Sequence, residues 1–189
     1  MTAQGVDPAA NADRDGASLA STSAQAPPPD DVDHIVAAWR RERPDLDVAP
    51  LLVLSRVSRL ARRLDLDRVQ AFARHQLEGW EFDVLSALRR AGRPYELSPG
   101  QLIRQTLVTS GTMTNRVDRL ERRGLVARRP DPTDRRGVIV WLTPAGQRTV
   151  DDAMADLLER ERALLAELSE GDRGDLAAML RRLLSPFES

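Results

Sequence analysis

The sequence of 189 residues contains no cysteine, no lysine and only two histidines, His34 and His75. The lack of cysteine excludes disulfides, thiolate redox sensors and cysteine zinc sites. Two histidines are too few for a histidine-rich metal site, so we expect neither a metal nor a cofactor. All 28 basic residues are arginines, a bias that we attribute to a GC-rich genome.

Long apolar runs are also missing. No stretch approaches the roughly 20 apolar residues that a membrane-crossing helix requires, and no charged-then-apolar leader opens the chain. We therefore expect a soluble cytoplasmic protein without a membrane partner. The sequence also offers no nucleophile–base pair and no glycine-rich phosphate loop, which argues against an enzyme and leaves no candidate catalytic residue.

What remains is a polar tail followed by amphipathic helices. Residues 1–30 are rich in Ala, Ser, Asp, Gly and Pro, and they bury too little apolar surface to offset their ordering entropy, so we predict a disordered tail. Apolar residues then recur at helical spacing. This spacing predicts helices over 31–43, 48–77, 80–91 and 144–168, and a last helix around 176–184.

The pattern changes in the middle of the chain. Ser98 and Pro99 form an N-cap and a first-turn proline, which predict a helix over 98–106. A second helix over 110–123 follows a short turn, and Gly124 ends it. Two strand-like segments, Leu125 to Arg129 and Val138 to Leu142, flank the charged turn DPTDRR. The predicted fold is mainly α: a winged helix-turn-helix with a small β-hairpin wing, flanked by N- and C-terminal helices.

Charge is concentrated in this central unit. The whole chain carries a net charge of −1, whereas residues 98–137 hold nine arginines against four acids and so carry +5. A local basic surface of this kind is expected where a protein contacts nucleic-acid phosphates.

The helix over 110–123 supplies candidate DNA contacts. Met113, Val117 and Leu120 recur on one face and are expected to point inward, which places Asn115 and Arg119 on the opposite face. Asn can pair with adenine and Arg with guanine in a major groove, while hydroxyls near the helix start can contact phosphates. A solvated helix face is the alternative. The candidate residues are Ser110, Thr112, Thr114, Asn115, Arg116 and Arg119.

The tip of the predicted wing adds three more candidates, Asp134, Arg135 and Arg136. Asp134 and Arg136 are two residues apart and can lie on one side, where the carboxylate could hold the guanidinium extended toward a minor groove. An ordinary surface ion pair is the alternative.

The run TSGTMTNRVDRLERRGLVARRPDPTDRRGVIVWLTPAGQ resembles the winged helix-turn-helix of MarR-family transcriptional regulators, most specifically in the D-x-R turn at 134–136 and in LTPAG at 142–146. The resemblance covers roughly residues 31–185. It implies a homodimer whose N- and C-terminal helices, 31–79 and 143–189, form a dimerisation region around the DNA-binding domain 80–142. It also implies a repressor that binds a pseudo-palindromic operator and is released by a small ligand.

A narrower resemblance is to the urate-responsive branch of that family, which has an extra N-terminal helix with a tryptophan. The matching ligand positions are Trp39, Asp83, Arg90 and Arg128. Two arginines could bind an anionic heterocycle, and the indole could stack on it. Other interpretations stay open: core packing for Trp39, a helix-dipole charge for Asp83 and phosphate contact for Arg128.

The leading hypothesis is therefore a ligand-responsive, DNA-binding transcriptional regulator, a homodimer released by a small anionic effector such as urate. A winged helix without small-molecule control is one alternative. A helical protein-interaction module that docks an acidic partner through its basic face is another. The salt dependence and the sequence preference of duplex binding would separate these hypotheses.

Overall fold

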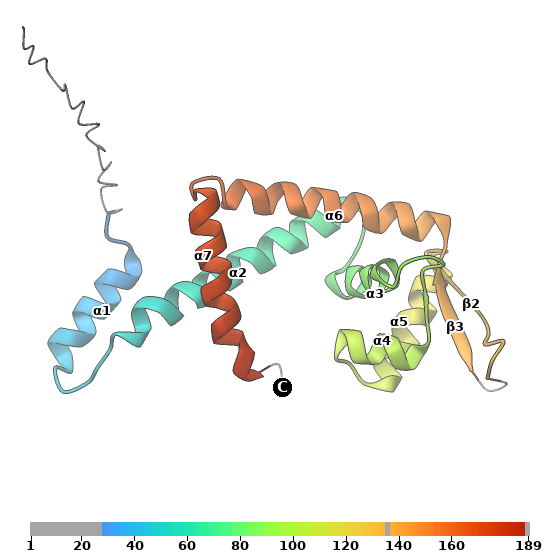
Figure 1. Cartoon of the computed structure of the whole chain (residues 1–189), viewed down its shortest axis with the longest axis horizontal. Helices are drawn as coiled ribbons and strands as arrows, with labels where there is room; N and C mark the ends of the chain where they lie inside the picture. Colours follow the sequence, from blue (N-terminus) through green and yellow to red (C-terminus); the bar gives the residue numbers. More distant parts are fainter. Residues whose placement is uncertain (1–27, 135–136, 188–189) are drawn as a thin grey trace, which may run out of the picture. The chain divides into compact units, whose positions relative to one another are not determined.

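A computed structural model describes residues 28–134 and 137–187 (Figure 1). The chain comprises two compact units, one that ends at Val53 and one that begins at Leu54. Each unit is described by itself. No helix within the described ranges is long and apolar enough to span a membrane.

The first unit is built around α1 (Asp31–Glu42) and the start of α2 (Pro50–Arg74). The side chain of Asp30 caps α1 by accepting hydrogen bonds from the backbone of Val32 and Asp33. Val32 and Val36 of α1 are buried, together with Val48. The predicted apolar stripe is only partly covered, because Trp39 on the same helix keeps 48 % of its surface exposed. Core packing within this unit therefore does not explain Trp39.

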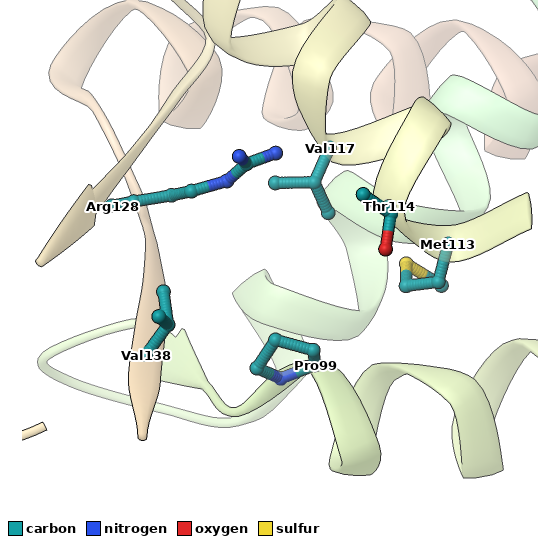
Figure 2. Close-up of a pocket in the computed structure, with 6 residues that line it drawn as sticks. All are labelled: Pro99, Met113, Thr114, Val117, Arg128 and Val138. Atoms are coloured by element: carbon teal, nitrogen blue, oxygen red, sulfur yellow. The ribbon is translucent and has the colours of Figure 1, made fainter. Parts of the chain in front are cut away.

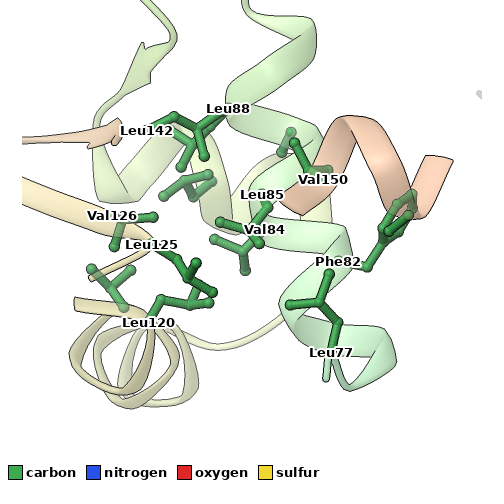
Figure 3. Packing of buried hydrophobic residues seen from close by; sticks show 14 of the residues in the cluster. Leu77, Phe82, Val84, Leu85, Leu88, Leu120, Leu125, Val126, Leu142 and Val150 are labelled. Atoms are coloured by element: carbon green, nitrogen blue, oxygen red, sulfur yellow. The ribbon is translucent and has the colours of Figure 1, made fainter. Parts of the chain in front are cut away.

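The second unit holds the main hydrophobic core, which Figure 3 shows from close by. Its elements are α3 (Gly79–Arg90), α4 (Pro99–Thr106), α5 (Ser110–Arg122), α6 (Pro144–Leu164) and a small sheet. Leu85 and Leu88 of α3 lie at its centre, where Leu120 of α5 and Val150 of α6 pack around them. The two helices of the helix-turn-helix, α4 and α5, thus share one hydrophobic core with α3 and α6.

The sheet has three strands, where the sequence predicted a two-stranded wing. β2 (Val126–Pro130) and β3 (Val138–Leu142) form the predicted antiparallel ribbon, with Arg128 opposite Val140. A further strand, β1 (Glu96–Leu97), pairs antiparallel with the other edge of β3, giving the order β1-β3-β2. The prediction missed β1 because two residues are too few to show an alternating pattern.

The C-terminal helices differ slightly from the prediction. α6 ends at Leu164 rather than 168, and α7 (Glu170–Leu184) begins after a capping box between Ser169 and Asp172, followed by a short 3-10 turn, η1 (Ser185–Phe187). None of the residues of α7, all within the described ranges, is buried. Large apolar side chains of the second unit are exposed on three helices: Leu54, Val57, Leu60, Leu66 and Val69 on α2, Leu158 and Leu164 on α6, and Leu176, Met179, Leu180, Leu183 and Leu184 on α7.

Candidate nucleic-acid interface

The helix-turn-helix is fixed by local signals at each of its ends. The Ser98 hydroxyl accepts a hydrogen bond from the Gln101 backbone at 3.3 Å and so caps α4. At the turn, Leu107 adopts the left-handed conformation with φ 54°. The Thr109 hydroxyl then caps α5 by accepting from the backbone of Thr112 at 3.4 Å. These caps confirm the predicted positions of both helices.

α5 has the two faces that its sequence predicted. Met113, Val117 and Leu120 are buried in the core. Ser110, Thr112, Thr114, Asn115 and Arg119 are exposed, and Arg116 is half-buried. Two of the hydroxyls already have partners: the Thr114 hydroxyl donates to the Ser110 carbonyl at 3.1 Å, and the hydroxyls of Thr109 and Thr112 lie 2.9 Å apart. The outward face of α5 is therefore ordered and polar.

Two residues at the start of α3 contact this face, and the sequence did not single them out. The Glu78 carboxylate accepts one hydrogen bond from Arg119 Nη2 and one from Trp80 Nε1, each at 2.6 Å. The guanidinium carbon of Arg119 lies 4.7 Å from the centroid of the Trp80 ring, and that of Arg116 lies 5.5 Å from it. Trp80 is half-buried, and its ring packs against the core as well as contacting the arginines of α5.

The carboxyl group in this cluster has a lowered pKa. Hydrogen bonds from Trp80 and Arg119 hold the pKa of the Glu78 carboxyl below its usual range. Trp80, Arg116 and Arg119 also line a surface hollow of about 290 Å³, together with Thr112 and Asn115. A carboxylate that stays ionised at neutral pH thus lies beside the face predicted to meet DNA.

Other arginines of the central unit have acidic partners as well. Arg123 Nη1 donates to Glu81, a carboxylate with only 2 % of its surface exposed, at 2.6 Å. Arg129 on β2 donates to Glu96 on β1, also at 2.6 Å. Because Arg119, Arg123 and Arg129 are paired with acids that lie before residue 98, the count of +5 over 98–137 overstates the charge that this surface presents to phosphates.

Within the second unit, Arg128 lies in a different hollow from Asp83 and Arg90. Asp83 and Arg90 line one hollow with Ser86, and Arg90 donates to the Ser86 hydroxyl at 3.1 Å. Arg128 lies in a different hollow and is paired with Asp118. Trp39 belongs to the first unit, where it lines a hollow with Ile35, Ala38 and Glu42. Only Asp83 and Arg90 are brought together within the second unit.

The hollow beside Arg128 lies between α5 and the wing (Figure 2). It has a volume of about 210 Å³, and its lining is mostly apolar. The Arg128 side chain reaches from β2 toward Val117 and Thr114 of α5, and its guanidinium is paired with Asp118 and with Glu121 at 3.7 Å. The remaining lining residues are Pro99, Met113 and Val138.

The wing turn is held by Asp131, whose carboxylate accepts from the Thr133 hydroxyl at 2.7 Å and from the Thr133 backbone at 2.8 Å. These hydrogen bonds lower the pKa of the Asp131 carboxyl. Asp134 is exposed in this turn, and its carbonyl accepts from the Gly137 backbone at 2.8 Å. The other two candidates of the wing, Arg135 and Arg136, lie outside the described residues.

Comparison with known proteins gives this architecture a family. A model of the MarR family matches residues 75–137, the segment from the end of α2 to the wing turn. The transcriptional regulator PecS of Dickeya dadantii is 39 % identical over 153 residues, which cover 81 % of this chain and 92 % of PecS. The chain belongs to the MarR family. It is a DNA-binding transcriptional regulator with a winged helix-turn-helix, and the relatives that define this assignment are regulators rather than enzymes.

Two further relatives carry information about regulation. The transcriptional repressor NicR of Pseudomonas putida is 32 % identical over 148 residues, covering 76 % of this chain and 92 % of NicR. The structure of Bordetella bronchiseptica BpsR, whose DNA binding is regulated by 6-hydroxynicotinic acid, matches 68 % of this chain and 98 % of BpsR, with 29 % identity and a TM-score of 0.52. This MarR-family chain therefore resembles both a named repressor and a protein that responds to a small aromatic acid.

Proposed function

We propose that this MarR-family regulator acts as a homodimeric repressor that binds a pseudo-palindromic operator and is released by a small anionic ligand. The observation that carries the proposal is the outward face of α5, where exposed Asn115 and two ordered arginines project from a helix fixed to the core. Such a helix can enter a major groove, where base edges distinguish one sequence from another.

In the proposed complex, Asn115 reads a base and the first turn of α5 contacts phosphates. The backbone N–H groups at a helix N-terminus attract an anion, and Ser110 and Thr112 are exposed beside them. Asp134 and the arginines 135 and 136 approach a minor groove at the wing. Two subunits would then contact half-sites about one helical turn, roughly 10 bp, apart.

The apolar side chains exposed on α2, α6 and α7 support the dimer. A run of leucines on α7, from Leu176 to Leu184, is solvent-exposed in the single chain, and further apolar residues are exposed along α2. Contiguous apolar surface of this kind marks an interaction site. We assign these helices to the dimerisation region, with residues 80–142 as the DNA-binding domain.

Two hollows of the DNA-binding unit suit a small anion. In one, Arg128 faces apolar side chains, so an aromatic acid could place its ring on Val117 and its carboxylate on the guanidinium, in competition with Asp118. In the other, Arg90 and Asp83 could bind a heterocycle such as urate that offers both an anionic and a donor edge. The narrower resemblance assigns Trp39 to the same ligand. Regulation of BpsR by 6-hydroxynicotinic acid supports a ligand of this chemical class.

The test is binding of the protein to a labelled duplex from the region upstream of its own gene, titrated with urate and with aromatic carboxylates. We expect one of these ligands to release the duplex, and Arg90→Ala or Arg128→Ala to abolish the release in a folded protein. Arg148→Ala, which removes an exposed arginine of α6, is the matched control. Tight binding that every ligand leaves unchanged would favour the alternative, a winged-helix regulator without small-molecule control.

Asn115→Ala tests the contact with bases. It should reduce binding to the operator while leaving binding to random duplex nearly unchanged, because an amide–base pair contributes to discrimination rather than to phosphate attraction. A loss of about tenfold on the operator corresponds to the lower part of the range for one base contact. Equal losses on operator and random duplex, measured at one salt concentration, would contradict the assigned role of Asn115.

A further inference from the structure

Trp80 and Glu78 occupy a place that the proposed contacts leave unexplained. They lie at the start of α3, about forty residues from α5 along the chain, yet they touch two of its arginines. Trp80 follows the first residue of α3, and its neighbours Glu81 and Phe82 are buried in the unit. The indole is therefore attached to a rigid part of the fold.

The Glu78 carboxylate uses its two oxygens separately. Oε1 accepts from Arg119 Nη2 and Oε2 accepts from the indole nitrogen of Trp80, so one side chain fixes the position of two others. The backbone N–H of Glu78 in turn donates to the buried Glu81 carboxylate at 2.9 Å, which ties this residue to the core. Glu78 thus links a guanidinium on the surface of α5 to the interior of the domain.

The indole ring adds a second restraint. A cation is attracted to the face of an aromatic ring within about 6 Å of its centroid, and Trp offers the strongest such face. Both Arg116 and Arg119 satisfy this distance, at 5.5 Å and 4.7 Å. An arginine that is ordered before binding loses less side-chain freedom when it meets a base, and its geometry is better defined.

We propose that Glu78 and Trp80 form a bracket that positions Arg116 and Arg119 on α5 and thereby sets the sequence specificity of DNA binding more than its affinity. This inference rests on the proposed contact between α5 and DNA. The Glu78 charge contributes in a second way, because a carboxylate close to the phosphate backbone opposes binding that depends on phosphate attraction alone. The bracket orders the two arginines and at the same time disfavours random duplex.

The test compares the full-length wild-type protein with Trp80→Leu, Trp80→Phe and Glu78→Gln. Two probes are used, a duplex selected by the wild type from a randomised library and a shuffled duplex of the same composition. Trp80→Leu should weaken binding to the selected duplex about tenfold while leaving the shuffled duplex within twofold, since only the ordered contact is lost. Trp80→Phe should recover part of the loss, because it restores an aromatic face without the N–H donor.

Glu78→Gln removes the charge and keeps a hydrogen-bonding side chain of the same shape. It should tighten binding to the shuffled duplex severalfold. The slope of log affinity against log salt concentration should become steeper by up to about one, which corresponds to one more released counterion. It should therefore lower the ratio of selected to shuffled affinity. Because the side chain is exposed at the surface, we expect the variant to fold, which thermal unfolding would verify.

The same fold offers a matched control. Arg89 donates to Asp151 at 2.8 Å and lies 4.7 Å from the centroid of the Tyr95 ring, a set of arginine, carboxylate and aromatic ring away from α5. Tyr95→Leu and Asp151→Asn should leave the selected-to-shuffled ratio unchanged. If the wild type prefers no duplex, the proposed function fails. If the wild type does select a sequence, the Trp80 and Glu78 variants test the bracket separately. The bracket alone is overturned if these variants change the ratio of selected to shuffled affinity no more than the control variants do.

Discussion

Gly146, in the first turn of α6, lies against the backbone where β2 begins. A Cβ atom at this position would overlap the carbonyl oxygen of Leu125 and lie 2.9 Å from its carbonyl carbon and 3.1 Å from Leu142 Cδ2. Carbon atoms in contact are normally 3.5–4.0 Å apart, so α6 or the Leu125 peptide would have to move by roughly 1 Å. This contact supplies a physical reason for the glycine of the LTPAG motif.

The displacement would break a hydrogen bond at the same carbonyl. The Leu125 oxygen accepts from the Thr143 backbone at 3.2 Å, whereas the Thr143 hydroxyl donates its proton to the nearer Gly124 carbonyl at 2.7 Å. Overpacking of about 2 kcal/mol and the loss of the backbone bond, about 1 kcal/mol, give an expected loss of roughly 3 kcal/mol for Gly146→Ala.

Urea unfolding followed by circular dichroism would measure this loss, with both proteins at one protomer concentration so that any association affects them equally. Gly111→Ala is the control, because a Cβ at that helical position meets open space and should be neutral or slightly stabilising. A Gly146→Ala protein within about 1 kcal/mol of wild type would refute the close approach of α6 to Leu125, since the closest atoms belong to the Leu125 backbone and not to a flexible side chain.

Two further changes test other parts of the DNA-binding unit. Leu107 is 91 % exposed and has φ 54°, a conformation that Asn tolerates better than Leu. Because almost no buried apolar surface is lost, Leu107→Asn should raise the free energy of unfolding by about 0.5 kcal/mol. A destabilised variant would contradict the argument that the Leu107 backbone is strained. Arg123→Met leaves the buried Glu81 carboxylate without its arginine and should lower the free energy of unfolding by about 2–3 kcal/mol. Adding Glu81→Met should recover part of this loss. If the losses of the two single variants simply add in the double variant, Arg123 and Glu81 are not coupled.

The sequence predicted most of the DNA-binding unit because the signals there are local. The Ser98 cap, Gly124 and the β-branched strand from Val138 each specify their own structure within a few residues, and all three appear in the fold as expected. α6 was predicted to extend to 168 because leucines continue beyond its end. The helix stops at Leu164 because Ser169 and Asp172 start a new helix with a capping box.

The partners of the arginines could not be predicted in the same way. A charge count over 98–137 includes the acids within that window, but Glu78, Glu81 and Glu96 lie before it along the chain and pair with arginines inside it. Each pairing joins residues more than thirty positions apart. They are brought together by the packing of α3 against α5 and by the sheet, in which β1 and β2 lie on either side of β3. Helical periodicity likewise could not show that Trp80, which packs against the core, also contacts two arginines of α5.

Arg128 shows the same limit for the ligand site. The narrower resemblance grouped it with Asp83 and Arg90, yet in this structure its guanidinium is paired with Asp118 of α5, in another hollow. A pair with 30 % and 44 % of its side chains exposed is weakly held, so an anionic ligand could take the place of the aspartate. The Arg90 and Arg128 variants would decide which of the two hollows binds the proposed effector.

α6 runs without a break from the wing of the DNA-binding domain to the apolar side chains exposed at its own C-terminal end. At one end, the Thr143 hydroxyl donates to the Gly124 carbonyl at 2.7 Å, and Gly146 packs on the peptide at the start of β2. Further along, Val150, Ala153 and Leu157 are buried in the core, whereas the far end of the helix exposes apolar side chains. Because the near end leaves no room for a methyl group between helix and strand, we expect the wing and α6 to move together. A shift of the far end of α6 in the proposed dimer would therefore be transmitted to the wing and to α5, which is the displacement needed to move two reading helices out of register with their half-sites.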